Sequence, residues 1–507
     1  MFFYLHVNLT KKRMSAAAGT FFGHPRGLAT LFFTEMWERF SYYGMRALLI
    51  LFMTAAATGA NPGMGLDDGT AAAIYGLYTS FVYLLSLPGG WVADKIWGQR
   101  QSIFVGGIII AAGHFSMALP SNTTFFFGLI LIVIGTGLLK PNVSSIVGEL
   151  YPEGGARRDA GFSVFYMGIN LGAFLGPILC GYLGQEINWH YGFSLAGFGM
   201  VFGLIQYRLG YKHLGDAGHL VTTDAEIVIK ARARRFYMFF AGVIMAAVAF
   251  GMLVRAGIIP LTIQQIAGGL GSSILIIVGL YFLYLFLFGG HTTQEKKHLG
   301  IILWLFVLAA IFWSGFEQAG SSLNLFAERA TDRVIAGWEM PASWLQSVNS
   351  TFIIIFAPIF GWIWITLAKV NRHPSFLFKF TFGLLGLAAG FFVLAWGAAQ
   401  TAGGAKAGMI FLIVTYFFHT VGELALSPVG MASITKLAPT GRMSQMMGIW
   451  FVATALGNLF AGLVAGDIET LGFDGLFYQV AWTSAAAGAI ALLLAKPLKK
   501  FVAVNIE

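Results

Sequence analysis

Long apolar stretches recur along the whole chain and are separated by short polar segments. Each stretch is close to the twenty residues that a helix needs to cross the hydrocarbon core of a bilayer. The pattern therefore predicts an all-α membrane protein with fourteen transmembrane helices, at residues 28–57, 71–93, 101–119, 124–150, 161–184, 191–211, 236–256, 266–289, 299–322, 345–368, 376–398, 407–434, 443–467 and 475–495.

Two polar linkers divide these spans into groups of six, two and six. The linkers are a basic segment around residues 208–235 and the segment 290–298, and the pair of spans between them contains no intramembrane charge. We therefore expect two six-helix bundles with an inserted, lipid-facing accessory hairpin. The predicted organisation is a cytoplasmic tail at 1–27, an N-terminal bundle at 28–211, linkers and hairpin at 212–298, a C-terminal bundle at 299–495 and a second tail at 496–507.

The first span carries four charges in an otherwise apolar segment. On a helix, these charges and two tyrosines fall within an arc of about 140° on one face. A charge at bilayer depth costs roughly 2.5–3.5 kcal/mol on insertion scales, so such a face is expected to line a water-filled cavity or a substrate pathway. The residues on this face are Glu35, Glu38, Arg39, Tyr42, Tyr43 and Arg46.

Composition and charge placement support the membrane prediction. The chain is 57% hydrophobic and 10% charged, whereas a soluble protein carries about 25% charged residues. If the N-terminus is cytoplasmic, all but seven of the 31 Lys and Arg residues lie in cytoplasmic segments, which predicts that both termini are cytoplasmic. The net charge of +9 is thereby explained by topology, and we expect no nucleic-acid partner.

The chain termini and the single cysteine give no indication of a functional site. Residues 1–27 lack a signal peptide, and Met14 is an alternative start that makes residues 1–13 a candidate non-native extension. Cys180 is expected to be a small packing residue.

The run Gly135-x-Gly-x-x-Lys140 lacks the Ser or Thr of a phosphate-binding loop, and no zinc-protease or nucleophile motif occurs. We predict no enzyme activity, no cofactor and no metal site.

Away from the ends of the predicted spans, seven charges lie within the membrane, and they sum to minus one. An unpaired carboxylate in a low-dielectric cavity can bind a proton, which favours proton coupling; the alternative is that all seven are paired and only lock helices together. His114 and His419 are more simply packing residues, although His419 lies four residues before a carboxylate. The seven charged residues are Glu35, Glu38, Glu317, Glu423, Arg39, Arg46 and Lys140.

The two halves also share a weak repeat. When the accessory pair is not counted, Gly135 to Pro141 in the fourth span align with Gly422 to Pro428 in the tenth, at residues 407–434. Parallel six-helix repeats are the architecture of major facilitator transporters. The segment from Gly90 to Arg100 resembles the cytoplasmic loop signature of that superfamily. In it, Asp94 is expected to cap a helix and to pair with a basic residue, unless the segment is an ordinary polar turn.

Four motifs together identify the chain as a member of the proton-dependent oligopeptide transporter family, of the prokaryotic type. The ten residues from Glu35 to Gly44 resemble the signature of the family's first helix without a departure. Residues 135–144, 165–172 and 312–318 resemble its motifs in the fourth, fifth and seventh spans. One departure is that the second span has no histidine where animal members carry one, so proton coupling must rest on carboxylates.

The resemblance implies roles for individual residues. Arg39, Lys140 and Tyr43 would bind the peptide carboxylate, and Glu423 would bind the amino group. Asn170 and Asn324 would add neutral hydrogen bonds at the amino end, and Tyr83 would border the pocket. The residues that would shape the side-chain pockets are Trp313, Trp450 and Ser427.

The resemblance also implies gates and a coupling mechanism. Arg46 with Glu317 would form an outer gate, and Lys140 with Glu423 an inner gate, while Glu35, Glu38 and Glu317 are the first candidates for the proton carrier. The implied function is a proton-coupled symporter that imports di- and tripeptides by alternating access.

The main alternative is a proton-coupled transporter of another organic anion or drug, and a channel, a purely structural membrane protein or a membrane enzyme are further alternatives. The expected partners are peptides, protons and membrane lipid. We expect a monomer in the bacterial inner membrane.

Overall fold

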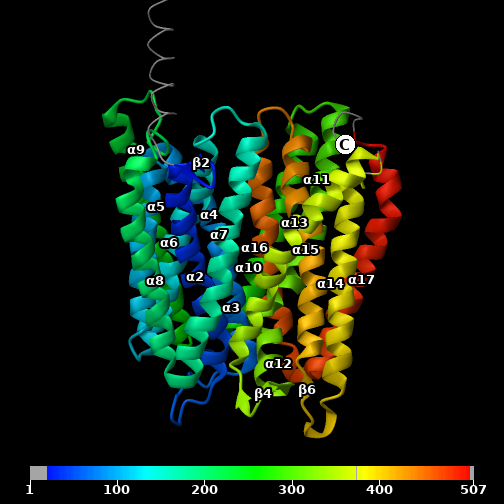
Figure 1. Ribbon diagram of the computed structural model, residues 1–507. Coiled ribbons are helices and arrows are strands. Elements are labelled where there is room, and N and C mark those ends of the chain that lie inside the picture. The colour runs from blue at the N-terminus through cyan, green and yellow to red at the C-terminus, as the bar shows by residue number, and fades with distance from the viewer. Residues whose placement is uncertain (1–19, 371, 373, 503–507) are drawn as a thin grey trace, which may run out of the picture.

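The computed structural model describes residues 20–370, 372 and 374–502 as a bundle of long helices that lie side by side (Figure 1). Residues 1–19 of the predicted N-terminal tail and residues 503–507 of the C-terminal one lie outside the described residues. The fourteen long helices among the described residues are α2 (Arg26–Thr54), α3 (Asp68–Leu84, continued by α4, Ser86–Val92), α5 (Gln99–Met117), α6 (Asn122–Glu149), α7 (Gly155–Tyr182), α8 (Trp189–Gly210), α9 (Glu226–Arg255), α10 (Ile263–Phe288), α11 (Thr293–Phe316), α13 (Ser347–Lys369), α14 (Phe376–Ala399), α15 (Ile410–Leu437), α16 (Met443–Ala465) and α17 (Ile468–Lys499).

Short elements connect the long helices. They are π-helical turns at Ala93–Trp97 and Leu183–Ile187, helix α12 (Ser322–Ala330), 3-10 turns at Tyr211–His213, Glu317–Gly320, Ala342–Gln346 and Ala402–Gly404, and the two-residue strands β1 (Thr20–Phe21), β2 (His24–Pro25), β3 (Thr331–Asp332), β4 (Val334–Ile335), β5 (Trp338–Glu339) and β6 (Ala407–Gly408). Among the described residues, eleven helices are long and apolar enough to cross a membrane. Helix α2 is not among them because it carries the charges that the sequence singled out.

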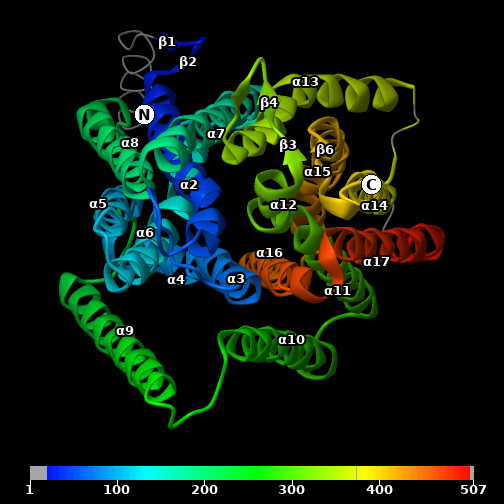
Figure 2. The ribbon, with the colours of Figure 1, turned by 90° about the horizontal axis from the view of Figure 1, so that it is seen from below.

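Apart from α9 and α10, the long helices form two groups (Figure 2). Helices α2 to α8 form the N-terminal half, and α11 with α13 to α17 form the C-terminal half. Helix α3 packs against α16 along one side of the seam between the halves, and α7 packs against α13 along the other. The predicted fold of two six-helix bundles is confirmed.

Both ends of the described chain lie at the same end of the bundle (Figure 1). We call the end with residues 20 and 502 the terminal end, and the opposite end the distal end. Helix α2 runs from the terminal end to the distal end, so Arg46 lies nearer the distal end than Arg39 does.

Helices α9 and α10 lie outside both halves and apart from each other (Figure 2). The prediction of an inserted accessory pair is confirmed, and its two helices lie apart from each other at the edge of the bundles. The span predicted at 236–256 also begins earlier, at Glu226, so part of the basic linker is helical. Lys230 pairs with Glu226 at 2.7 Å one turn away, and Ala, Arg and Lys are good helix formers.

Candidate functional site

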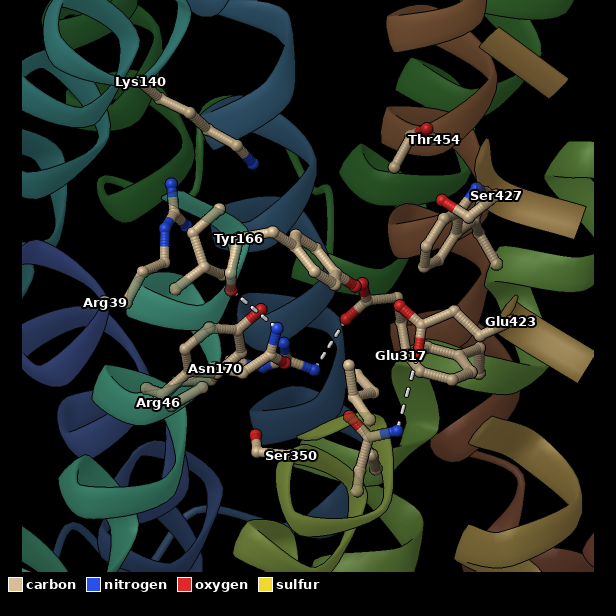
Figure 3. A pocket seen from close by; sticks show the side chains of 18 of the residues that line it. Arg39, Arg46, Lys140, Tyr166, Asn170, Glu317, Ser350, Glu423, Ser427 and Thr454 are labelled. Atoms are coloured by element: carbon tan, nitrogen blue, oxygen red, sulfur yellow. Dashed lines mark hydrogen bonds and ion pairs between the residues drawn. The ribbon is translucent and has the colours of Figure 1, made fainter. Parts of the chain in front are cut away.

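A cavity of about 440 Å³ lies between the two halves. Helices α2, α3, α6 and α7 supply one wall, and α11, α13, α15 and α16 supply the other. Figure 3 shows the polar side chains of both walls pointing into this space. The predicted site residues that line the cavity are Arg39, Tyr43, Tyr83, Lys140, Asn170, Trp313, Glu423, Ser427 and Trp450, together with Glu35, Arg46 and Glu317.

The wall of the N-terminal half is cationic. The Nε atom of Arg39 lies 2.8 Å from Oε1 of Glu35 and 2.9 Å from Oε2 of Glu38, so one guanidinium is held by two acids of its own helix. Glu35 borders the cavity, whereas Glu38 is fully buried behind Arg39 and does not line it. The signature of the first span is therefore a compact cluster of three charges that presents Arg39 to the cavity.

Lys140 provides the second cation of this wall. Its Nζ atom lies 3.7 Å from the centre of the Tyr83 ring, a cation–π contact between α6 and α3. Pro141 follows it inside α6, and Pro428 follows Ser427 inside α15, so the repeat in the sequence corresponds to helix-internal prolines in both halves.

The facing wall in the C-terminal half is acidic. Glu423 of α15 lies across the cavity from Arg39 and Lys140 (Figure 3). Asn349 of α13 donates to Oγ1 of Thr420 at 2.9 Å and makes a longer contact of 3.5 Å with Oε2 of Glu423. Asn349 therefore anchors the carboxylate of Glu423 from a neighbouring helix.

The distal end of the cavity is closed by polar contacts between the halves. Arg46 on α2 forms an ion pair of 2.6 Å with Glu317 at the end of α11, and it also donates to the hydroxyl of Tyr75. Nearer the surface, Arg329 makes a two-pronged ion pair with Asp68, at 2.6 and 2.8 Å. The predicted Arg46–Glu317 pair is present.

The predicted Lys140–Glu423 pair is absent. No ion pair joins Lys140 to an acid within the described part of the chain. Lys140 lies towards the terminal end of α6, whereas the Arg46–Glu317 pair joins the halves nearer the distal end. The predicted inner gate is therefore not formed in this conformation, and it stays a prediction for a conformation in which the halves close at the terminal end.

Two further predictions are also corrected. Asn324 does not line the cavity: its Nδ2 atom donates to the carbonyl of Ala47 at 2.8 Å and ties α12 to α2. Asp94 is exposed in a π-helical turn and does not cap α5, whose N-cap is Gly98. Arg100 of the same segment binds the carbonyls of Ala217 and Gly215, both at 2.5 Å, and so fastens the linker to α5.

Several residues that line the cavity are absent from the predictions. Helix α13 carries no predicted site residue, yet Gln346, Asn349 and Ser350 border the cavity from the start of that helix. Their spacing of three and four residues places three polar side chains on one helical face, which is the signal that could have found them. Tyr166 and Thr454 also line the cavity, as does His419, whose ring lies 4.8 Å from that of Phe391.

Comparison with known proteins decides the family. A family model described as the POT family matches residues 100–473. The chain belongs to the POT family. It is 42% identical over 497 residues to the peptide transporter YePEPT of Yersinia enterocolitica, with 95% of this chain and 96% of that protein covered.

Two further comparisons cover nearly the whole chain. The Di-/tripeptide transporter of Lactococcus lactis is 34% identical to this POT member, over 95% of this chain and 97% of that protein. A crystal structure of the peptide transporter POT in complex with sulfate matches with a TM-score of 0.87 at 38% identity, covering 97% of this chain and 99% of that one. The predicted family is confirmed, and the chain is a multi-pass membrane transporter, not an enzyme.

Proposed function

We propose that this POT-family protein is a proton-coupled symporter that imports di- and tripeptides by alternating access. The observation that carries the proposal is the opposite charge of the two cavity walls, with Arg39 and Lys140 on one side and Glu423 on the other (Figure 3). A peptide with free termini is a zwitterion that matches both walls at once. The names of the relatives from Yersinia enterocolitica and Lactococcus lactis support the same substrate class.

In this proposal each wall binds one end of the peptide. Arg39, Lys140 and Tyr43 bind the carboxylate through charge-assisted hydrogen bonds. Glu423 binds the amino group, and Asn170 adds a neutral hydrogen bond at that end. Asn349 takes the supporting role that the resemblance implied for Asn324. Main-chain recognition leaves the peptide side chains to the remaining lining residues, so many side chains are tolerated. Those lining residues are Tyr83, Trp313, Trp450 and Ser427.

The proposed cycle alternates the two gates. Arg46–Glu317 holds the distal end closed, and Lys140 approaches Glu423 when the halves close at the terminal end. Protonation of Glu35, Glu38 or Glu317 weakens the ion pair that each acid makes, which couples proton entry to movement of the halves.

The proposal includes a place and an orientation. We propose that the two halves correspond to residues 28–211 and 299–495 and that the linkers and the accessory pair occupy 212–298. Both termini face the cytoplasm of a bacterium, the protein works as a monomer in the inner membrane, and the distal end faces outward. The basic segments at the terminal end agree with this orientation.

Uptake of labelled dialanine into proteoliposomes tests the function. We expect accumulation above the external concentration only with an inward proton gradient, and competition by unlabelled dialanine but not by its methyl ester or its N-acetyl derivative. Accumulation without a gradient would refute proton coupling. Equal competition by the blocked peptides would refute zwitterion binding and favour another organic anion or a drug as substrate.

A further inference from the structure

A second cavity lies outside the two halves, in the groove between α9 and the end of α4. Its volume is about 650 Å³. Trp91 of α4 forms one wall, and one face of α9 forms the other, because its lining residues recur at helical spacing. We call this space the α9 groove; α9 lies outside the bundles in Figure 2, and its lining residues are Ile227, Val228, Ala231, Arg232, Arg235, Phe236 and Phe239.

The α9 groove carries more positive than negative charge. Arg232 pairs with Asp224 at 2.7 Å and also donates to the carbonyl of Lys95 at 3.2 Å. Arg235, one turn further along the same face, forms no ion pair with an acid in the described part of the chain. Arg235 therefore presents an uncompensated guanidinium to the groove, and the side chain of Lys95 adds charge nearby.

The groove changes from charged to apolar within one helical turn. Phe236 follows Arg235 directly, and its ring lies 5.4 Å from that of Trp91. Phe239, another turn further on, is 70% exposed. No residue in the most apolar 18-residue stretch of α9 is buried. Tyr237 accepts a hydrogen bond of 2.8 Å from Nε1 of Trp97 at the same level. Arginines beside Trp and Tyr, followed by exposed apolar residues, are typical of the boundary between lipid headgroups and acyl chains.

We infer that the α9 groove binds one anionic phospholipid of the surrounding bilayer. Its phosphate lies against Arg235 and Arg232, because a phosphate supplies the negative charge that the groove lacks and accepts bidentate guanidinium hydrogen bonds. An acyl chain covers Phe239 and the exposed edge of Trp91. Such a lipid fills the space between α9 and the N-terminal half, so it joins the accessory helix to the transport domain.

Lipid retention in native mass spectrometry tests this inference. The full-length protein and its Arg235→Gln and Arg234→Gln variants are purified and equilibrated with equimolar phosphatidylglycerol and phosphatidylethanolamine. The lipid that each protein retains is then measured. Arg234 is the matched control, since it is an exposed arginine on the same helix that does not line the groove. We expect Arg235→Gln to bind phosphatidylglycerol about tenfold more weakly, the loss of one charge-assisted contact, and Arg234→Gln to bind like the unchanged protein. Arg235→Lys should keep most of the binding.

Quenching of tryptophan fluorescence locates the lipid. Phosphatidylglycerol with brominated acyl chains should quench the tryptophan fluorescence of the unchanged protein more than that of a Trp91→Phe variant. When both proteins also carry Arg235→Gln, this difference in quenching should vanish. Equal weakening in the Arg234 and Arg235 variants would overturn the inference, because it would show diffuse attraction of anionic lipid. Preference for phosphatidylethanolamine, or a Trp91 signal that is unchanged in Arg235→Gln, would also overturn it.

Discussion

At the scale of single residues, the three cations that line the cavity differ in what holds them. Arg39 is held by two acids on its own helix, Arg46 by an acid of the other half, and Lys140 by the face of an aromatic ring. The ring compensates the charge of Lys140 far less than a carboxylate does. Lys140 is therefore the cation of the cavity with most to gain from a substrate carboxylate.

Replacement of Lys140 should weaken peptide binding directly. We expect Lys140→Gln to lower the apparent affinity for dialanine by about ten- to a hundredfold, the value of one charge-assisted hydrogen bond. Competition in a counterflow assay measures this affinity. Lys95→Gln is the control, because Lys95 lies outside the cavity and carries the same charge. An unchanged affinity in Lys140→Gln would remove Lys140 from the proposed binding site.

The acidic wall makes a prediction about the other end of the peptide. Glu423→Gln keeps the shape of the side chain and removes its charge, so it should weaken free dipeptides much more than N-acetylated ones. Asn349→Leu should act in the same direction and less strongly, since it removes only the contact that anchors Glu423. Inhibition constants for paired free and acetylated peptides measure both effects. An equal loss for the two peptides would show that Glu423 acts only as a gate.

Proton coupling can be separated from binding at three carboxylates. Glu35→Gln, Glu38→Gln and Glu317→Gln each remove the charge of one acid. Glu35 and Glu38 pair with Arg39, and Glu317 pairs with Arg46. In the variant that lacks the proton carrier, gradient-driven accumulation should disappear while peptide counterflow, which moves no net proton, persists at least in part. If all three variants accumulate peptide with the usual pH dependence, the carrier lies elsewhere, and Glu423 and His419 become the next candidates.

Most of the site was predictable from the sequence because charge inside an apolar span is so costly. That cost singles out Glu35, Arg39, Arg46, Lys140 and Glu423 from the sequence alone, and all five line the cavity. Uncharged amides carry no such signal. The resemblance implied a role for Asn324, which ties two helices together, and no such signal pointed to Asn349, which contacts Glu423.

At the scale of helices, apolar length predicted the elements well and their ends less well. Helix α14 runs over residues 376–399, against a predicted 376–398. Helix α9 begins ten residues before its predicted span, because residues 226–235 contain five charged residues and so do not extend the apolar stretch, although they continue the helix. The separation of α9 from α10 was not predictable either, since nothing in their sequences specifies which neighbour each helix contacts.

Glycines set how closely helices of the two halves approach. A Cβ added to Gly462 of α16 would lie 2.4 Å from the carbonyl oxygen of Ala72 and 2.6 Å from the Cα atom of Gly76, both on α3. These contacts are with backbone, which cannot move aside as a flexible side chain can. The close approach of α3 and α16 towards the distal end therefore depends on the missing side chain.

Substitution of Gly462 should consequently destabilise the distal contact. We expect Gly462→Ala to cost about 1–3 kcal/mol, as overpacking does in other proteins. A thiol-reactive fluorescent dye measures the loss, because the single cysteine, Cys180, is buried and reacts on unfolding. Gly448→Ala in the same helix is the control, since its Cβ would meet only Leu87 Cδ2 at an ordinary 3.5 Å. Equal unfolding temperatures in the two variants would contradict a tight contact.

At the scale of the whole molecule, the polar contacts between the halves are unevenly distributed. Within the described residues, they gather at the distal end, where Arg46 meets Glu317, Arg329 meets Asp68, and Asn324 meets the carbonyl of Ala47. Lys140 and Glu423 remain unpaired with each other towards the terminal end. Which end is closed could not be predicted from the sequence, because both gates are encoded in the same chain.

Alternating access requires the distal contacts to break once in every cycle. A short, cleavable thiol crosslinker across Asp68→Cys and Arg329→Cys, in a Cys180→Ser background, should therefore abolish dialanine uptake, and a reductant should restore it. Removal of the surface ion pair itself should change little, since such pairs contribute about 0–1 kcal/mol.

A matched crosslink at the same end of the molecule provides the control. Glu339 and Lys406 also form an ion pair, at 3.6 Å, but both belong to the C-terminal half. Crosslinked Glu339→Cys/Lys406→Cys should transport normally, because the halves remain free to separate. Full uptake in the crosslinked Asp68/Arg329 pair would mean that the distal ends do not part during transport, and the cavity would then have to load and release peptide from the terminal end alone.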